Sequence, residues 1–452
     1  MNPLGYMAAV TPTSGDATSG DPYLNCIIVG GVLKCSSDKH EGQINIPISD
    51  ILCILPDGKD SQGYTVVFLK EAGSSNTPPR LERIRLETAL PAVLSGHLLT
   101  EVPGHLNNEC HVVISTASGT GTARVLFGVL QQLLAWIGLD RYKVHETQSA
   151  QTITELCHSL FVPQAEVGVS QTIVLLSGDG GLCDIIDAFH GTPKDIQTEP
   201  IIALIPAGTG NAMASSIGLM AHPKAALMAL LRGKPFPLPV FVATFSNGAR
   251  YVQDNNSRVS RIYGGVVASW GIHASLVADS DTVEYRKFGA DRFKMAAKEL
   301  LFPSDGSEAH KYNGTITLLK RDGQQCIEHE MVLEHKEHAY VLATLVSNLE
   351  KDFKISPYSA ALDGSLRIIY FGPMPSQRVV QLLSAAYQDG QHVQHDDIMY
   401  SEIEGLKIDF HEVDEKWRRV CIDGRVVVVE EEGWMSVHKE GRSLVNLLSS
   451  GL

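Results

Sequence analysis

Three glycine-rich stretches near the middle of the chain carry residue types that can handle phosphate groups. They are Ser118 to Gly121 (SGTG), Ser177 to Gly181 (SGDGG) and Gly208 to Asn211 (GTGN). Glycine permits positive φ angles and lets backbone N–H groups approach a phosphate closely. Where such a turn begins a helix, the free N–H groups and the helix dipole favour an anion. The pattern therefore predicts a phosphate site built from three turns.

Asp179 is the unusual member, because a carboxylate among phosphate-binding amides costs electrostatic energy. It could face a cation, or take a proton from an attacking hydroxyl as in phosphoryl transfer. It could equally cap the next helix, and spacing alone leaves both interpretations open. No G-K-[ST] follows any of the three turns and none fits GxGxxG, which argues against a P-loop enzyme and a dinucleotide-binding oxidoreductase.

The elements around these turns predict how they are positioned. Each turn follows an apolar run and precedes an apolar periodicity of three to four residues, which is typical of strand, turn, helix units. Such alternation predicts a doubly wound parallel sheet, whose carboxyl edge would collect the turns. The expected strands are 110–115, 172–176 and 201–206; the expected core faces are Val125, Leu126, Val129, Leu130, Leu133, Leu134 and Ile137, then Leu182, Ile185, Ile186 and Phe189.

Composition and residue patterning divide the chain into four predicted regions. Residues 1–22 are rich in small and turn residues, as in a disordered tail, and residues 23–105 form a β-rich N-terminal extension. Residues 106–235 are the α/β domain. Residues 236–452 form a β-rich, sandwich-like domain with one clear helix at 376–388.

Composition narrows the function classes. The net charge is −14 over 452 residues, which argues against non-specific nucleic-acid binding. The eight cysteines show neither a CxxC pair nor zinc-type spacing, so reduced thiols are expected. No signal peptide and no apolar run of roughly 18 residues is present. We expect a cytoplasmic protein with peripheral contact to intracellular membranes.

The two later motifs resemble a known family. SGDGG, followed by PAGTGNAMASSIG (206–218), resembles the diacylglycerol kinase catalytic fold, and within it the sphingosine (long-chain base) kinases. The segments 269–293, 372–383 and 421–427 continue the resemblance, which covers roughly residues 110–445. Residues 23–105 resemble, more weakly, the N-terminal extension of larger long-chain base kinases.

The resemblance implies ATP and Mg²⁺ as cofactors and roles for matching residues. Asp179 would be the general base that deprotonates the lipid hydroxyl. Arg286 and Arg292 would bind phosphate, and Asp423 would reach the nucleotide through Mg²⁺ or water. The remaining nucleotide contacts would be Ser118, Gly119, Gly121, Thr147, Ser177, Gly178, Gly180, Gly208, Thr209, Gly210 and Asn211. No metal-ligating residue is assigned.

Several positions depart from the family pattern. The first turn lacks an Asn-Pro opening, Asp184 and Asp187-Ala188 replace a Glu and an Asn-Gly, and Arg425 replaces a late acid.

The lipid site has two possible alignments, because a buried substrate ammonium needs a paired carboxylate and the relevant segment is two residues longer here. Asp279 or Asp281 supplies that carboxylate if the extra residues lie early. If they lie late, Ser275 and Val277 occupy the place and the acid is lost.

These observations support three hypotheses. The first is an ATP-dependent lipid kinase that phosphorylates the primary hydroxyl of sphingoid bases, converting sphingosine or phytosphingosine to the 1-phosphate. The second is a diacylglycerol or ceramide kinase. The third is a non-catalytic lipid- or nucleotide-binding relative, which the altered first turn and Arg425 motivate. An NAD kinase is disfavoured by the PAGTGN motif and the β-rich C-terminal half.

Overall fold

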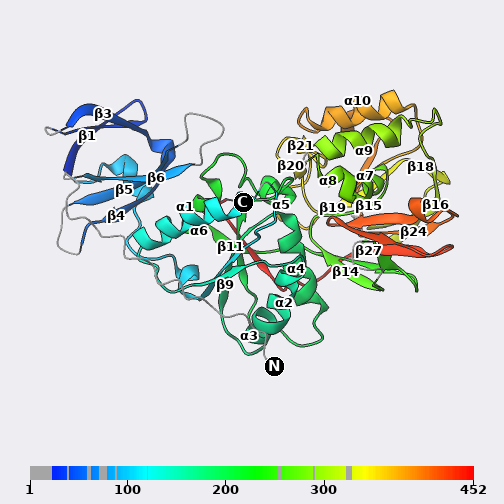
Figure 1. Ribbon diagram of the computed structural model, residues 1–452, viewed down its shortest axis with the longest axis horizontal. Coiled ribbons are helices and arrows are strands. Elements are labelled where there is room, and N and C mark those ends of the chain that lie inside the picture. The colour runs from blue at the N-terminus through cyan, green and yellow to red at the C-terminus, as the bar shows by residue number, and fades with distance from the viewer. Residues whose placement is uncertain are drawn as a thin grey trace.

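The computed structural model describes residues 23–37, 40–58, 63–70, 79–86, 89–119, 121–252, 257–288, 291–321 and 328–451. These residues form an N-terminal sheet, a central α/β layer and a C-terminal β-rich region, arranged in a row (Figure 1). The predicted tail at 1–22 lies outside the described residues.

The N-terminal extension is a six-stranded sheet in the order β3-β2-β1-β6-β5-β4, in which only β1 and β6 pair in parallel. Its buried residues divide between two cores. Ile46 and Val66 belong to the sheet's own core, whereas Leu52 and Val67 pack into the core of the central region. The strands are β1 (Tyr23–Val29), β2 (Val32–Ser37), β3 (His40–Pro47), β4 (Ile51–Pro56), β5 (Tyr64–Lys70) and β6 (Arg80–Leu86).

One cysteine expectation is wrong. Cys26 and Cys35 face each other in the β1–β2 register and form a disulfide. Cysteines 53, 110, 157, 183 and 421 are free and buried, as expected. Spacing did not reveal the pair, because nine residues that turn back as a hairpin contain no recognisable disulfide motif.

The central sheet confirms the predicted fold class. Its order is β11-β28-β10-β9-β7-β8, and all neighbours are parallel except β11 and β28. The strands are β7 (Glu109–Ile114), β8 (Lys143–Glu146), β9 (Gln171–Ser177), β10 (Ile201–Pro206), β11 (Lys234–Pro237) and β28 (Asn446–Ser449). All seven residues of β9 are buried, as expected for a parallel strand covered on both faces.

Helices cover both faces of this sheet. They are α1 (Ala123–Trp136), α2 (Thr152–Leu156), α3 (Val162–Glu166), α4 (Asp179–Gly191), α5 (Ala212–Ser216) and α6 (Ala225–Arg232). α1 and α6 contact the N-terminal sheet, and α4 contacts the C-terminal region. The predicted core face of α4 is fully buried. The face of α1 extends one residue less than expected, because Val125 is exposed.

β28 was not predicted in this sheet. It comes from the end of the chain, beyond the whole β-rich region, and pairs with β10. In Figure 1 it is the red strand within the cyan and green centre. The α/β layer is therefore completed by residues that composition groups with the C-terminal region.

The C-terminal region consists of two antiparallel sheets. The first has the order β14-β12-β27-β24-β16-β17, with β18 paired to β16; the second has the order β13-β26-β25-β15-β19-β22-β23. Trp270 packs between them, with its ring centroid 5.7 Å from that of Tyr312 and 5.2 Å from that of Phe410. The predicted sandwich-like arrangement is confirmed.

The strands of the first sheet are β12 (Phe241–Phe245), β14 (Arg261–Gly264), β16 (Tyr312–Arg321), β17 (Glu328–Val332), β18 (Glu337–His338), β24 (Gly405–Phe410) and β27 (Trp434–Lys439). Those of the second are β13 (Arg250–Tyr251), β15 (Val267–Gly271), β19 (Tyr340–Thr344), β22 (Arg367–Phe371), β23 (Met399–Glu402), β25 (Arg419–Ile422) and β26 (Arg425–Val428). β20 (Asn348–Glu350) and β21 (Phe353–Lys354) form a small hairpin.

Four helices accompany these sheets. They are α7 (Ile272–Ser280), α8 (Val283–Arg286), α9 (Asp291–Leu301) and α10 (Ser376–Ala386). Only α10 was predicted as a helix. None of the helices in the described part of the chain is long and apolar enough to cross a membrane.

Candidate phosphotransfer site

The three glycine turns meet at the carboxyl edge of the central sheet, as the sequence predicts. The Gly178 N–H donates to Ser118 Oγ at 3.0 Å, which joins the first turn to the second. The Ala207 N–H donates to the Ser177 carbonyl at 3.0 Å, which joins the second to the third. The turns therefore form one surface rather than three separate ones.

Close packing explains why two of these glycines are required. A Cβ on Gly208 would lie 2.4 Å from Gly178 Cα, and a Cβ on Gly119 would lie 2.4 Å from the Ala207 carbonyl oxygen. Gly119 also has a φ of +54°, which disfavours any other residue. By contrast, a Cβ on Gly180 would meet no atom within 4 Å, so Gly180 leaves open space at the start of α4.

Asn211 shapes the third turn. It adopts a left-handed conformation with φ 54°, which asparagine tolerates better than most residues. Its side chain accepts from the Gly208 N–H at 2.9 Å and donates to the Gly208 carbonyl at 2.8 Å. These two bonds hold the turn closed, whereas Thr209 at its tip is exposed.

Asp179 begins α4 and caps α5. Its carboxylate accepts from the Ala212 N–H at 2.7 Å and from the Met213 N–H at 3.0 Å. It also lines a small pocket with Ser177, Gly178 and Asn211. Asp179 therefore caps a helix, but the helix is α5 after the third turn and not the next helix, α4, as the capping interpretation had it. One carboxylate consequently couples the second and third turns.

The surroundings of Asp179 alter its proton affinity. Burial raises the pKa of Asp179, and the nearby charge of Asp423 raises it further, while the two backbone N–H groups oppose the shift. A carboxylate with a raised pKa is a better proton acceptor than an ordinary one. The electrostatics thus suit a general base, which remains a prediction for this residue.

Asp423 binds the backbone at the start of β15. Its two oxygens accept from the N–H groups of Gly265, Val266 and Val267 at 2.7, 3.0 and 2.6 Å, and from the thiol of Cys183 at 3.2 Å. Burial raises the pKa of Asp423. The residue joins α4 to the C-terminal sheets, and its predicted nucleotide contact is not among these bonds.

The unusual residues at 184, 187 and 425 form one ion-pair cluster. Arg425 donates to Asp184 at 2.6 Å and to Asp187 at 2.7 Å, and Asp187 also accepts from the Tyr263 N–H at 2.9 Å. The neighbouring carboxylates raise the pKa of Arg425. The departures from the family pattern thus compensate one another, an outcome that a search for separate motifs cannot detect.

Thr147 connects two strand ends rather than a glycine turn. It is buried, its hydroxyl accepts from the Thr116 N–H at 3.0 Å, and its carbonyl accepts from the Thr116 hydroxyl at 2.8 Å. These bonds fix the end of β8 to the end of β7, where the first turn begins.

The predicted phosphate-binding arginines lie beside α7. Arg292 pairs with Asp281 at 3.4 Å, and its guanidinium lies 4.8 Å from the Phe293 ring centroid. Arg286 ends α8, and its side chain lies outside the described part of the structure. The bonds that the structure gives Arg292 include none to the glycine turns.

The two acids predicted to recognise an amine are both paired with arginines. Asp279 pairs with Arg419 at 2.8 Å, and Asp281 pairs with Arg292. Ser275, one turn before Asp279 on α7, is buried and accepts from the Tyr312 hydroxyl at 2.7 Å. Val277 lies partly buried on the same helix. The positions that either alignment invokes therefore lie on α7 or, for Asp281, directly after it.

A second, mostly apolar pocket adjoins α5. Met213 lines it from α5, Ile217 from the position after α5, Val346 from the loop after β19, and Ala360 to Leu362 from the loop before β22. Met213 is also a partner of Asp179, so this pocket and the Asp179 pocket lie on two sides of one helix.

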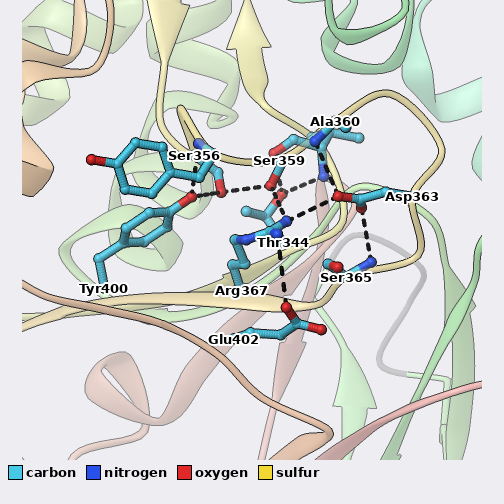
Figure 2. Close-up of polar contacts among 11 residues, drawn as sticks. Thr344, Ser356, Ser359, Ala360, Asp363, Ser365, Arg367, Tyr400 and Glu402 are labelled. Carbon is cyan, nitrogen blue, oxygen red and sulfur yellow. Dashed lines mark hydrogen bonds and ion pairs between the residues drawn. The ribbon is translucent and has the colours of Figure 1, made fainter. Parts of the chain in front are cut away.

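Polar contacts hold one wall of that pocket. Figure 2 shows Arg367 reaching Ser359 and Asp363, at 3.1 and 3.3 Å. Tyr400 and Ser356 share a hydrogen bond of 2.8 Å beside them. The loop that carries Ala360 to Leu362 is therefore held in place by Arg367 of β22 and Tyr400 of β23.

No cluster of three metal-ligating side chains occurs among the residues that the structure describes. The nearby charge of Asp423 raises the proton affinity of Asp179, and a cation beside Asp179 would offset that charge.

Comparison with protein families finds a match for the central part of the chain. Residues 109–243 match the family model described as "Diacylglycerol kinase catalytic domain". Sphingosine kinase B of Dictyostelium discoideum is 31% identical over 138 residues, 30% of this chain and 17% of that protein. Sphingosine kinase 2 of Arabidopsis thaliana is 26% identical over 169 residues, 36% of this chain and 31% of that protein. The aligned segments span less than a third of either relative.

Comparison with solved structures extends the fold similarity. A candidate diacylglycerol kinase of Bacillus anthracis str. Sterne has a TM-score of 0.51 and 15% identity, covering 76% of this chain and 95% of that one. A second structure of such a protein from the same organism has a TM-score of 0.50 and 14% identity, covering 76% and 97%. At such identities the likeness shows the fold alone.

Proposed function

We propose, from the match of residues 109–243 to the diacylglycerol kinase catalytic domain model, that the chain is an ATP-dependent lipid kinase. In this proposal it transfers a phosphoryl group from ATP to the primary hydroxyl of a lipid. The observation that carries the proposal is the convergence of three glycine turns on one edge, with Asp179 between the second and the third.

The chemistry assigned to each part follows from its geometry. The amides of the glycine turns and the start of α4 would bind the ATP phosphates, since N–H groups at a helix start favour anions. Asp179 would accept the proton of the lipid hydroxyl as it attacks the terminal phosphorus. ATP would bring Mg²⁺, and that ion would neutralise phosphate charge.

A sphingoid base is the first substrate class to test. The motifs resemble those of sphingosine kinases, and both curated relatives are named as such. A neutral lipid, either diacylglycerol or ceramide, is the second class. The observation that favours it is the pairing of Asp279 and Asp281 with arginines.

The deciding experiment measures transfer from labelled ATP with Mg²⁺ to sphingosine, ceramide and diacylglycerol, with the unmodified chain and Asp179→Asn. We expect the substitution to lower the rate by about 10²–10⁴-fold, the usual contribution of a general base, while ATP still binds. Asp140→Asn, at an exposed acid after α1, is the matched control and should leave the rate unchanged.

Two results would contradict the proposal. Equal rates for Asp179→Asn and the unmodified chain would remove Asp179 from the chemistry. ATP binding without transfer to any of the three lipids would favour the non-catalytic relative instead.

A further inference from the structure

The inference concerns the lipid head group and rests on the proposed kinase activity. The carboxylates on α4, on and just after α7, and at the β25–β26 turn already have partners. Asp179 and Asp423 bind backbone N–H groups. The other four of this set pair with arginines. The charge that an ammonium head group needs is therefore matched inside the protein.

Arg419 has one buried nitrogen whose hydrogen bonding is incomplete among the described residues. One terminal nitrogen pairs with Asp279 at 2.8 Å, and Nε donates to the Lys416 carbonyl at 2.7 Å. The other terminal nitrogen, Nη2, is buried and has no hydrogen-bond partner in the described structure. A buried donor without a partner is costly, and it is satisfied by an oxygen acceptor.

The location of Arg419 relates it to the proposed site. It begins β25, and Asp423 follows the end of that strand four residues later. Four extended residues span roughly 13 Å, comparable to a lipid head group with the first carbons of its chains. α7, which carries Asp279 and Ser275, packs over β25 and β15.

We propose that Arg419 determines head-group specificity. By occupying Asp279 it removes the carboxylate that an amino lipid would use, and its free Nη2 donor binds an oxygen of an uncharged head group. A hydroxylated lipid with an ester or amide carbonyl fits this description, whereas a lipid with an ammonium group does not.

Displacement of Arg419 by a substrate amine is unfavourable for two reasons. The guanidinium belongs to the protein chain and is also fixed by its hydrogen bond to the Lys416 carbonyl. The entropy cost of placing it beside Asp279 is therefore already met in the folded protein. An incoming ammonium would also leave that guanidinium without a counter-charge in a partly buried place, which is strongly destabilising.

The test compares kcat/KM for diacylglycerol, ceramide and sphingosine in mixed micelles, with Arg419→Gln, Arg419→Lys and Asp279→Asn. The unmodified chain should prefer the neutral lipids over sphingosine by at least about tenfold, a discrimination of about 1.4 kcal/mol. Arg419→Gln should shift the ratio of sphingosine to diacylglycerol about tenfold toward sphingosine, because it frees Asp279. Arg419→Lys should retain the original preference.

The double variant Arg419→Gln with Asp279→Asn tests the cause of that shift, since it should lose the gained sphingosine activity. A thermal melt checks that each variant is folded. Asp279→Asn alone should keep the neutral-lipid preference, which provides a readout even if Arg419→Gln unfolds.

The outcomes separate this inference from the proposed function. If the unmodified chain prefers sphingosine, the role of Arg419 is overturned and the kinase proposal stays intact. The same holds if the unmodified chain phosphorylates sphingosine and Asp279→Asn abolishes this sphingosine activity. Transfer to no lipid at all would overturn both.

Discussion

Individual residues show how closely the three glycine turns are packed. At Gly208 the space for a side chain is filled by the backbone of the neighbouring turn, and at Gly128, within α1, a Cβ would meet nothing within 4 Å. The two positions therefore form a matched pair, in which the same substitution has opposite expected effects.

Gly208→Ala should destabilise the fold by roughly 1–3 kcal/mol, the usual cost of overpacking, and should weaken ATP binding. Gly128→Ala should be neutral or stabilising, by up to about 1 kcal/mol, because alanine favours a helix over glycine. Chemical denaturation and ATP titration measure both effects. Equal stability of the two variants would show that the turns separate to make room.

The residue types at the site were largely predictable, because glycine, asparagine and aspartate at turns act locally. The partners of the charged residues were not. Asp279, Asp281 and Arg425 were recognised as unusual, but their partners lie up to 241 residues away in sequence. Such pairs depend on how the two halves of the chain pack, which no short motif encodes.

At the scale of elements, α4 connects the glycine turns to the C-terminal sheets. Its first residue caps α5, and its later turns carry Cys183, Asp184 and Asp187, which bind groups of the β-rich region. A change at the far end of α4 should therefore reach Asp179 through a rigid helix.

Arg425→Met tests how strongly the ion pairs of Arg425 with Asp184 and Asp187 stabilise the packing of α4 on the β-rich region. Removing the arginine leaves two partly buried carboxylates without a counter-charge, so we expect a loss of roughly 2–3 kcal/mol, somewhat below the cost at fully buried pairs. Adding Asp184→Asn and Asp187→Asn should restore part of it. Thermal unfolding of the single and triple variants measures the difference, and a triple variant less stable than Arg425→Met would contradict the compensation.

The three strand, turn and helix units that begin with β7, β9 and β10 were predictable because each unit is local and periodic, whereas β8, α2 and α3 between them were not predicted. α7 and α9 were not predicted, since their apolar residues were read as part of a β-rich region. α7 follows β15 directly after Gly271, whose φ of +87° turns the chain sharply. That conformation depends on tertiary packing rather than on a recognisable helix start.

For the whole molecule, buried histidines predict sensitivity to acid. Burial lowers the pKa of His111, His190 and His273 to about 4, from an ordinary value of 6.5. The unfolded chain therefore binds more protons than the folded one below pH 6.5, and stability rises with pH in that range. Above about pH 6.5 these histidines are neutral in both the folded and the unfolded chain, so they cost no stability. As the pH falls toward 4, keeping them unprotonated in the folded protein costs more and more stability.

Melting temperatures measured between pH 4 and 7 check this expectation. His111→Gln should flatten part of the slope, because one titrating group is removed. His158→Gln, at an exposed histidine, should leave the slope unchanged. A slope that is the same in all three proteins would contradict the assignment to His111.

The N-terminal sheet is attached to the central α/β layer by specific hydrogen bonds and an ion pair as well as by apolar packing. Arg232, at the end of α6, donates to the carbonyls of Leu52 and His97 at 2.8 and 3.0 Å, and Lys224 pairs with Asp50 at 3.4 Å. We expect Arg232→Gln to increase the rate of limited proteolysis between this sheet and β7. Lys234→Gln, at an exposed position on β11, is the control, and equal cleavage in both would contradict the role of Arg232.

The position of β28 has a consequence for how the protein is made. Because β28 lies between β10 and β11, the central sheet gains its sixth strand only after residue 449 has left the ribosome, with the whole β-rich region already synthesised. The growing chain must hold an open sheet edge at β10 during that time, and edges of this kind invite pairing with other chains. A protein shortened before Asn446 should therefore accumulate as aggregates rather than as a weaker enzyme.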